Sequence, residues 1–334
     1  MPVATDLFDR ELRDLRVSVT DRCNFRCTYC MPKEIFGPGY EFLPRDQLLT
    51  FEEITSLVHH FVSRGVTKVR LTGGEPLLRK GIEGLVSMIA EVEGVADLTL
   101  TTNASLLARK AATLADAGLD RVTVSLDAMD DPTFQAMNDV GFPVSTVLEA
   151  IETASSVGLG PIKVNAVVKR GVNEHSVVDL ARHFRGTGHI VRFIEYMDVG
   201  NSNGWRLDDV VPADEMVQAI HAEFPLEPIP PNYPGEVANR FRYVDGQGEV
   251  GVIASVTKPF CGSCTRARIS AEGTVYTCLF ASSGTSLRDV IRTGGDLGAA
   301  IDDVWGKRDD RYSEIRSSNT ARLAVPVEMS YIGG

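Results

Sequence analysis

The sequence lacks several features that would identify common classes of protein. It has no apolar run near twenty residues, and no charged, apolar and small-residue pattern at its start. We therefore expect neither a membrane span nor a secretory signal. The 334 residues carry a net charge of -11, which argues against general binding of nucleic acid or of a membrane surface. These absences predict a soluble, cytoplasmic protein with one large domain or two smaller ones.

Cysteine is scarce, but its six copies are not scattered. They form two groups of three: Cys23, Cys27 and Cys30, and then Cys261, Cys264 and Cys278. Without a secretory signal, disulfides are not expected. The nearest histidines, His59 and His221, are not at the spacing of zinc ligands, so a zinc ion would need a fourth ligand from elsewhere. Three thiolates on a four-iron cluster leave one iron open, and iron–sulfur clusters are the better interpretation of both groups.

Apolar strands alternate with helical patterns over the first two thirds of the chain. Six strands are expected at residues 15–19, 68–71, 97–102, 121–126, 162–168 and 190–196. This alternation implies parallel pairing with right-handed crossovers. Polar residues appear near the carboxyl end of every strand, which favours a barrel with its chemistry at one mouth over a doubly wound sheet. We predict an α/β fold, with a partial (β/α)6 TIM-like barrel over residues 1–224.

The composition changes after residue 224. Five prolines between residues 225 and 234 indicate a linker or an irregular cover. Strands are expected at 241–244 and 250–256, followed by a hairpin of 266–270 and 274–278. Cys264 and Cys278 are equidistant from Ala271, so we expect the hairpin to place them opposite one another. Residues 225–334 are predicted to form a smaller α+β domain that covers the barrel mouth and carries the second cysteine group.

Several segments together resemble a known family. The C-x3-C-x2-C pattern within residues 20–32 resembles the signature of the radical S-adenosylmethionine (SAM) superfamily, and Gly73-Gly-Glu-Pro76 resembles the segment that this superfamily uses for the methionine moiety. Within the superfamily, the chain resembles the GTP 3′,8-cyclase family, which opens molybdenum cofactor biosynthesis. The narrower likeness depends on residues 15–32, 69–77, 192–198, 260–268 and 333–334. Ala104 and Thr265 depart from the residues that are common in the family, but no cysteine or arginine is lost.

The resemblance implies a lyase with two [4Fe-4S] clusters and SAM as cofactors. A 5′-deoxyadenosyl radical would take a hydrogen from C3′ of GTP, and C3′ would then bond to C8 of the guanine. The implied product is (8S)-3′,8-cyclo-7,8-dihydroguanosine 5′-triphosphate. The resemblance further implies an electron donor and a downstream enzyme that makes cyclic pyranopterin monophosphate, and it allows a homodimer. Because no P-loop motif is present, GTP would be a substrate and not an energy source.

The resemblance also assigns roles to residues. Cys23, Cys27 and Cys30 would bind the first cluster, and Cys261, Cys264 and Cys278 the second, whose open iron would hold the guanine base. Contacts with SAM are expected from Tyr29, Gly73, Gly74, Glu75, Ser125 and Met197. Contacts with GTP are expected from Arg16, Arg70, Thr101, Lys163, Arg266, Ala267 and Arg268; arginine suits phosphate oxygens because it binds them through two donors. The terminal Gly333 and Gly334 would reach the active site and assist catalysis.

Two alternatives stay open at this stage. One is a different radical SAM enzyme with an auxiliary cluster, such as an enzyme that modifies peptides. It would need an apolar or peptide-binding groove, whereas the arginines favour a triphosphate. The other is a non-catalytic iron–sulfur carrier or a zinc-stabilised interaction module, which would not bind SAM. Formation of 5′-deoxyadenosine that depends on GTP would distinguish the three.

Overall fold

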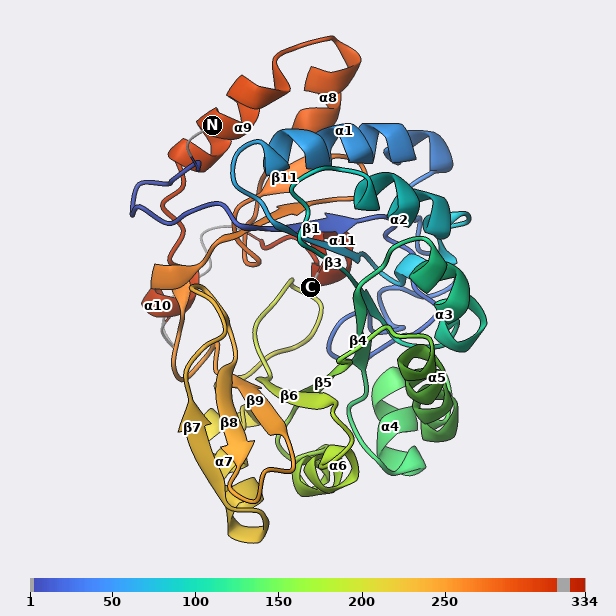
Figure 1. Cartoon of the computed structure of the whole chain (residues 1–334), viewed down its shortest axis with the longest axis vertical. Coiled ribbons are helices and arrows are strands. Elements are labelled where there is room, and N and C mark those ends of the chain that lie inside the picture. Colours follow the sequence, from blue (N-terminus) through green and yellow to red (C-terminus); the bar gives the residue numbers. More distant parts are fainter. Residues whose placement is uncertain (1–2, 317–324, 334) are drawn as a thin grey trace.

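A single curved sheet with helices on its outside forms the molecule (Figure 1). The computed structural model describes residues 3–316 and 325–333. In this part of the chain the sheet has twelve strands, in the order β12-β11-β10-β1-β2-β3-β4-β5-β6-β9-β8-β7. Its six central strands are all parallel to their neighbours. They are β1 (Asp14–Ser18), β2 (Lys68–Thr72), β3 (Asp97–Thr102), β4 (Arg121–Ser125), β5 (Lys163–Val168) and β6 (Ile190–Glu195). The predicted α/β partial barrel is confirmed.

Seven helices follow the pattern that the sequence predicts and cover the outer face of the barrel. They are α1 (Phe51–Val62), α2 (Ile82–Ala90), α3 (Leu107–Asp116), α4 (Asp131–Asn138), α5 (Val144–Ser156), α6 (Ser176–Phe184) and α7 (Ala213–Glu223). The first begins with a capping box, in which the Thr50 hydroxyl accepts the Glu53 N–H and the Glu53 carboxylate accepts the Thr50 N–H. Within the described residues, no helix combines the length and the apolar character that crossing a membrane requires.

The strands after residue 224 join both edges of the barrel sheet. On one side β9 (Glu249–Ile253) is parallel to β6 and continues into β8 (Asn239–Tyr243) and β7 (Leu226–Ile229). On the other side β10 (Arg266–Ile269) is parallel to β1 and continues into β11 (Thr274–Tyr276) and β12 (Thr285–Ser286). The chain ends with α8 (Leu287–Arg292), α9 (Leu297–Gly306), α10 (Tyr312–Ile315) and α11 (Met329–Ile332). Turns of 3-10 helix lie at Arg45–Gln47, Pro76–Leu78, Leu207–Asp209 and Cys261–Ser263.

Two details of the C-terminal region differ from the prediction. The proline-rich span contains β7, an edge strand, where proline is tolerated because one side of its backbone needs no partner. The hairpin of β10 and β11 pairs Arg268 with Tyr276, so that the same register carried outward places Cys278 opposite Arg266, not opposite Cys264. The shift is two residues. Because side chains alternate with a period of two, it leaves Cys264 and Cys278 on one face of the hairpin.

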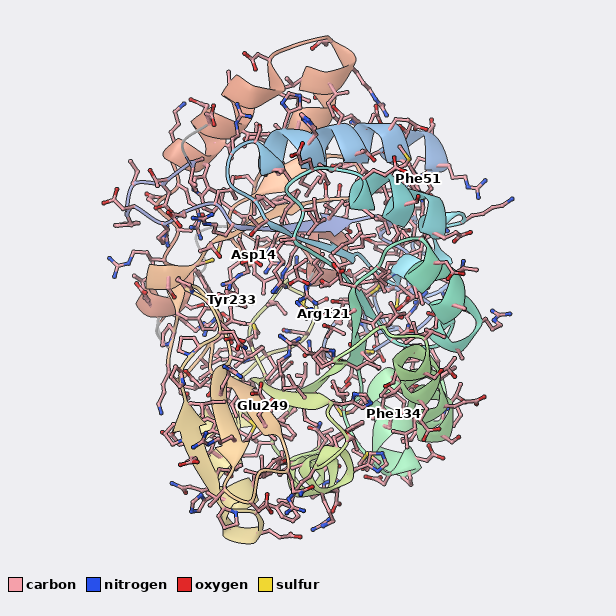
Figure 2. All side chains as sticks on the ribbon, in the orientation of Figure 1. Asp14, Phe51, Arg121, Phe134, Tyr233 and Glu249 are labelled. Carbon is pink, nitrogen blue, oxygen red and sulfur yellow. The ribbon has the colours of Figure 1, made fainter. Side chains whose placement is uncertain are left out.

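The two faces of the barrel sheet are chemically different. Apolar residues such as Val17, Leu71 and Phe193 point outward and are fully buried against the helices. The alternate residues point inward and are polar, whereas the interior of a typical barrel is packed with branched apolar side chains. Figure 2 labels Asp14, Arg121 and Tyr233 around the middle of the molecule, among the side chains that converge there. A polar interior leaves room for a ligand at the centre.

Candidate active site

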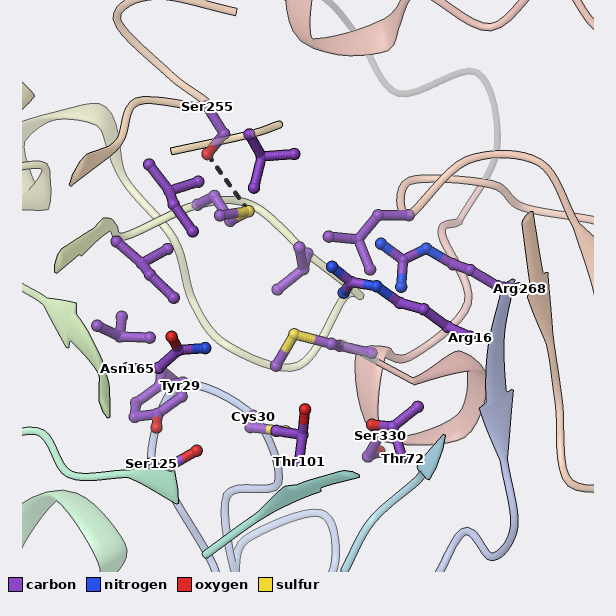
Figure 3. Close-up of a pocket in the computed structure, with 18 of the residues that line it drawn as sticks. Arg16, Tyr29, Cys30, Thr72, Thr101, Ser125, Asn165, Ser255, Arg268 and Ser330 are labelled. Carbon is purple, nitrogen blue, oxygen red and sulfur yellow. Dashed lines mark hydrogen bonds between the residues drawn. The ribbon is translucent and has the colours of Figure 1, made fainter. Parts of the chain in front are cut away.

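A cavity of about 300 Å³ occupies the middle of the barrel. Both cysteine groups line it, although more than two hundred residues separate them in the sequence. Figure 3 shows one part of its wall, in which Cys30, Thr101 and Ser125 lie on one side and Arg16 and Arg268 extend next to one another on the other. The cavity therefore brings together the two predicted metal sites and predicted ligands of both SAM and GTP.

The first cysteine loop follows β1 and is fixed by its own backbone. The N–H groups of Cys30 and Met31 both donate to the Cys27 carbonyl, at 2.9 and 2.8 Å. The Arg26 guanidinium donates to the Cys23 carbonyl at 2.8 Å, and the Phe25 N–H donates to the Cys23 Sγ at 3.4 Å. Backbone donors that face a cysteine sulfur are a usual feature of iron–sulfur sites, where they tune the cluster.

Gly73 and Gly74 support this loop through close backbone contacts. The N–H groups of Gly74 and Glu75 donate to the carbonyls of Thr20 and Arg22 in the loop, both at 2.8 Å. Both glycines line the cavity, and their contact with SAM stays a prediction. A Cβ on Gly73 or Gly74 would lie 2.3 Å from the same carbonyl oxygens. The absence of a side chain is thus required by the close approach of two backbone segments.

Glu75 ties the end of β2 to the end of β3. Its carboxylate accepts from the N–H groups of Leu77 and Asn103, at 3.0 and 2.8 Å, and from the Thr102 hydroxyl at 2.8 Å. Burial raises the pKa of this carboxyl to about 7 against these three donors. Glu75 lines the cavity, but its contact with SAM stays a prediction.

The other predicted SAM residues also line the cavity. The Tyr29 hydroxyl donates to Asp127 Oδ2 at 2.9 Å, so its ring and backbone, rather than its hydroxyl, remain available to a ligand. Burial raises the pKa of Asp127 to about 6. The Met197 sulfur accepts from the Ser255 hydroxyl at 3.5 Å, as the dashed line in Figure 3 shows. Ser125 lies at the end of β4, beside the first cysteine loop.

The second cysteine group lies before and after the β10–β11 hairpin. Its members are near the amino end of β10, whereas the first loop follows the carboxyl end of the neighbouring, parallel strand β1. All three of its members line the cavity, and the Phe280 N–H donates to the Cys278 Sγ at 3.5 Å. Burial disfavours ionisation of Cys264, but the Arg266 and Arg308 cations outweigh it and lower the pKa of this thiol to about 7. For Cys278, burial and then Asp310 outweigh the Phe280 N–H and the Arg268 cation, and the pKa of this thiol rises to about 12.

The donor set fits iron–sulfur clusters better than single metal ions. In the described residues, no three histidine, cysteine, aspartate or glutamate side chains are arranged to hold a metal ion. A mononuclear zinc site would draw its thiolates to within about 4 Å of one another, because each zinc–sulfur bond is about 2.3 Å long. Each group instead offers three cysteines and a backbone N–H that faces a sulfur. These are the donors that a four-iron cluster with one open iron requires.

Arginines without acidic partners give the cavity its charge. Among the ion pairs of the described residues, none involves Arg16, Arg70, Arg192, Arg266 or Arg268, all of which line the cavity. Arg70 donates to the hydroxyls of Thr101 and Thr123, at 3.0 and 2.9 Å, and these hydroxyls bring no negative charge. Burial, followed by Arg268, Arg70 and Arg266, lowers the pKa of Arg16. A concentration of unpaired cations in a buried site is suited to a polyanion.

Arg192 is the cation that sequence reasoning missed. It lies in the middle of β6, donates to Asn165 Oδ1 at 2.9 Å and has its pKa lowered to about 9 by burial and then by Arg70. Its charge between the apolar neighbours Val191 and Phe193 was the available signal. β6 and β10 flank the barrel strands β1 to β5 on opposite sides of the sheet. Arg192 on β6 therefore faces the cavity from the side away from Arg268 on β10.

Three predicted GTP residues do not lie where we expected them. Lys163 begins β5, so it sits toward the amino ends of the strands and does not line the cavity. Arg16 and Arg70 lie in the middle of their strands, not at the carboxyl ends. Ala267 alternates with Arg266 and Arg268, and its side chain packs outward into the apolar core. Only its backbone could contribute to a site inside the barrel.

The C-terminal tail reaches the wall of the barrel. The Gly333 carbonyl accepts a hydrogen bond from Arg268, and a Cβ on Gly333 would lie 2.3 Å from the Thr72 Cγ2. Helix α11, just before it, contributes Met329 and Ser330 to the cavity lining. Gly334 lies outside the described residues, so its predicted role is untested.

Comparisons with protein families divide the chain into two parts. Residues 17–184 match the Radical SAM superfamily, and residues 189–314 match the family described as Molybdenum Cofactor Synthesis C. Curated relatives named GTP 3′,8-cyclase cover almost the whole chain. One from Acidothermus cellulolyticus is 55% identical over 98% of this chain and 98% of its own. Another from Xanthomonas campestris is 51% identical over 98% and 97%, and one from Staphylococcus saprophyticus is 46% identical over 99% and 98%.

Solved structures share the fold at low sequence identity. The Streptococcus suis protein SuiB, crystallised with its precursor peptide SuiA, superposes with a TM-score of 0.62 at 14% identity, over 88% of this chain and 68% of SuiB. Native anSMEcpe with bound AdoMet superposes with a TM-score of 0.59 at 14% identity, over 94% and 93%. At this identity the likeness concerns the architecture alone.

Proposed function

This chain belongs to the GTP 3′,8-cyclase family within the radical SAM superfamily, and we propose how its residues divide the work of that reaction. It is a radical SAM enzyme, a lyase, that cyclises GTP in the biosynthesis of the molybdenum cofactor. SAM and an iron–sulfur cluster are its cofactors. The finer assignments below are proposals, and they concern the second cluster, the ligand contacts and the partners.

The first cysteine loop and the segment after β2 form the SAM side of the site. Cys23, Cys27 and Cys30 would hold the first cluster, whose open iron would take the amino and carboxylate groups of SAM. When bound, this pair of cofactors supplies the one-electron chemistry that begins the reaction. The protein holds the loop rigid through Gly73 and Gly74, and the Tyr29 ring, Ser125 and Met197 would contact the rest of the cofactor.

The unpaired arginines form the GTP side, and they are the single observation that carries this proposal. Arg16, Arg70, Arg192, Arg266 and Arg268 would bind the triphosphate, with Thr101 as a hydroxyl donor. A triphosphate would bring the negative charge that the described residues do not supply. Lys163 would add charge from the far side of the barrel. The sugar would then lie between the triphosphate site and the first cysteine loop, where its C3′ can meet the radical.

The second cysteine group would hold another four-iron cluster, at Cys261, Cys264 and Cys278, with its open iron toward the guanine base. Gly333, which bonds to Arg268, and the terminal Gly334 would assist catalysis. A boundary near residue 224 would separate the radical SAM barrel from the part that carries this cluster. The enzyme would work in the cytoplasm with an electron donor, pass its product to an enzyme that makes cyclic pyranopterin monophosphate, and could do so as a homodimer.

Anaerobic reconstitution tests the proposal. We expect about eight irons per chain from two four-iron clusters, and formation of 5′-deoxyadenosine and a cyclised nucleotide only when SAM, GTP and a reductant are all present. Four irons per chain would contradict the second cluster. Cleavage of SAM that is indifferent to GTP would contradict the arrangement of the substrate, and would favour a peptide-modifying enzyme instead.

A further inference from the structure

The N-terminal segment before β1 packs against the end of the chain. Figure 1 shows it, in dark blue, beside α9. The Leu7 N–H donates to the Arg308 carbonyl at 3.3 Å, and the Trp305 indole N–H donates to the Arg10 carbonyl at 3.1 Å. Two charged residues of this segment, Asp6 and Arg10, are nevertheless buried, with side chains that are 0% and 2% exposed. Charged side chains are almost never buried to this extent unless they are paired.

The buried pair is completed by an arginine from the other end of the chain. Asp6 Oδ2 accepts from Arg10 Nε at 2.6 Å and from Arg308 Nη1 at 2.9 Å. The Arg308 side chain is 2% exposed, and its guanidinium stacks on the Trp305 ring at 4.7 Å. The remaining Asp6 oxygen accepts the N–H groups of Phe8 and Arg10. The carboxylate is therefore the hub that orients both guanidinium groups.

The two guanidinium groups reach the backbone at, or next to, all three cysteines of the second group. Arg10 Nη1 donates to the Cys261 carbonyl at 2.8 Å. Arg308 Nη1 donates to the Cys264 carbonyl at 2.9 Å, and Arg308 Nε donates to the carbonyl of Thr277, next to Cys278, at 3.1 Å. For each cysteine, a buried guanidinium group therefore donates a hydrogen bond to the carbonyl of that residue or of the residue next to it. Arg308 also lies close enough to the Cys264 thiol to lower its pKa.

The two cysteine groups differ in how far their positions depend on hydrogen bonds from other parts of the chain. The first group lies within eight residues of one loop, which closes on itself through backbone hydrogen bonds. In the second group, Cys278 is separated from Cys261 and Cys264 by the β10–β11 hairpin. Sulfurs on two segments that a hairpin separates converge only if another element fixes their spacing. Hydrogen bonds from outside the ligand set are known to orient metal ligands in this way.

We propose that Asp6, Arg10 and Arg308 form a clamp that positions Cys261, Cys264 and Cys278 for the second cluster. The inference rests on the proposed function, since that function supplies the second cluster. The clamp residues are positioning residues: they bond to the peptides of the ligands and not to a substrate. By fixing the second cluster on the barrel edge, the clamp fixes the guanine site relative to the first cysteine loop.

A full-length variant with Cys23, Cys27 and Cys30 replaced by Ala isolates the second cluster for the test. Its iron content, its rate of iron release to a chelator and the EPR spectrum of its reduced cluster are measured after anaerobic reconstitution. In this background we expect Arg308→Met and Asp6→Asn to release iron at least about tenfold faster, the usual scale for loss of a partner that orients a metal ligand. Arg308→Lys, which keeps the charge but not the fork, should fall between. Arg182→Met, on an exposed ion pair with Glu223, is the matched control and should behave as the parent.

A reciprocal background separates the clamp from general folding. With Cys261, Cys264 and Cys278 replaced by Ala, Arg308→Met should leave the iron release and the EPR spectrum of the first cluster unchanged. Loss of iron in both backgrounds would overturn the clamp, because the arginine would then serve the fold as a whole. Unchanged iron release in the first background would overturn it as well. If the variant that lacks only Cys23, Cys27 and Cys30 holds no iron, the two-cluster proposal fails, and the clamp fails with it. If that variant holds iron and Arg308→Met has no effect on it, the clamp alone is refuted.

Discussion

Replacing Arg16 by Met should stabilise the empty protein and weaken its binding of GTP. Arg16 lies in register with Arg268 on one neighbouring strand and with Arg70 on the other. Adjacent strands are about 4.8 Å apart, and we take the charges at the ends of these long side chains to be about 8 Å apart. At an effective dielectric constant of about 20, each pair then repels by about 2 kcal/mol. Removal of Arg16 relieves two such pairs, or about 4 kcal/mol at most before solvent and mobile ions screen them.

The two effects of Arg16→Met have opposite signs, which makes the test stringent. We expect the nucleotide-free protein to gain about 1–3 kcal/mol, which raises the melting temperature by roughly 2–6 °C in a chain of this size. One charge-assisted contact with a phosphate is worth about 1.5–3 kcal/mol, so the dissociation constant for GTP should rise about 10- to 150-fold. Thermal unfolding and calorimetric titration with GTP, both on the cluster-loaded protein without a reductant, measure the two quantities.

Arg121→Met is the matched control. Arg121 also lies inside the barrel, but it forms an ion pair with Asp97. Asp97 forms a second ion pair with Lys68, whose Nζ is 3.3 Å from the Asp97 carboxylate. Removing Arg121 should therefore destabilise the protein and not stabilise it, because a partly buried carboxylate loses its closer partner. If Arg16→Met instead lowers the melting temperature and leaves GTP affinity unchanged, the cations of the cavity are balanced within the fold and the reasoning is wrong.

Three further perturbations test other parts of the site. Burial, and then Arg192 and Arg121, lower the pKa of Lys163 to about 7. A bound triphosphate would restore the charge of Lys163, so GTP binding should take up a proton, and the affinity for GTP should fall by up to about tenfold per pH unit between about pH 7.5 and 9. The Lys163→Arg variant should lack this pH dependence. An affinity of the parent protein that does not change with pH would refute the role of Lys163. Gly74→Ala should reduce the iron bound by the first cysteine group and leave that of the second unchanged, because the new Cβ would meet the Arg22 carbonyl. The control is Gly84→Ala in α2, where a Cβ has open space; it should leave the iron content of both groups unchanged. Arg192→Met should weaken GTP binding about tenfold or more with SAM binding unchanged in the same titration; equal loss of both would place Arg192 in the fold and not in the GTP site.

Local signals in the sequence predicted most of the barrel. The capping box at Thr50 and Glu53 places the start of α1 at Phe51, and the alternation of leucine and threonine within residues 97–102 predicts β3 at its observed bounds. These features depend on neighbours in the chain, so a single sequence carries them. The cysteine groups were likewise found by their spacing, and both groups line the same cavity.

Features that depend on distant contacts were not predicted. The Glu75 carboxylate binds the ends of two strands, and nothing near it in the sequence identifies Thr102 and Asn103 as its partners. Lys163 was grouped with residues at the carboxyl ends of strands, although the expected strand at 162–168 and the observed β5 both place it at the amino end. Arg308 bonds to carbonyls that are at least thirty residues away, and backbone acceptors leave no mark on the composition.

The attachment of β9 to β6 and of β10 to β1 has a consequence for how this protein can be divided. A fragment ending at residue 224 would keep all six barrel strands but expose two full rows of unpaired backbone N–H and C=O groups, one at each end of its sheet. Exposed edges of this kind recruit other chains and lead to aggregation. The barrel fragment therefore depends on the rest of the chain for solubility as well as for chemistry, and co-expressed halves should be recovered where the first alone is not.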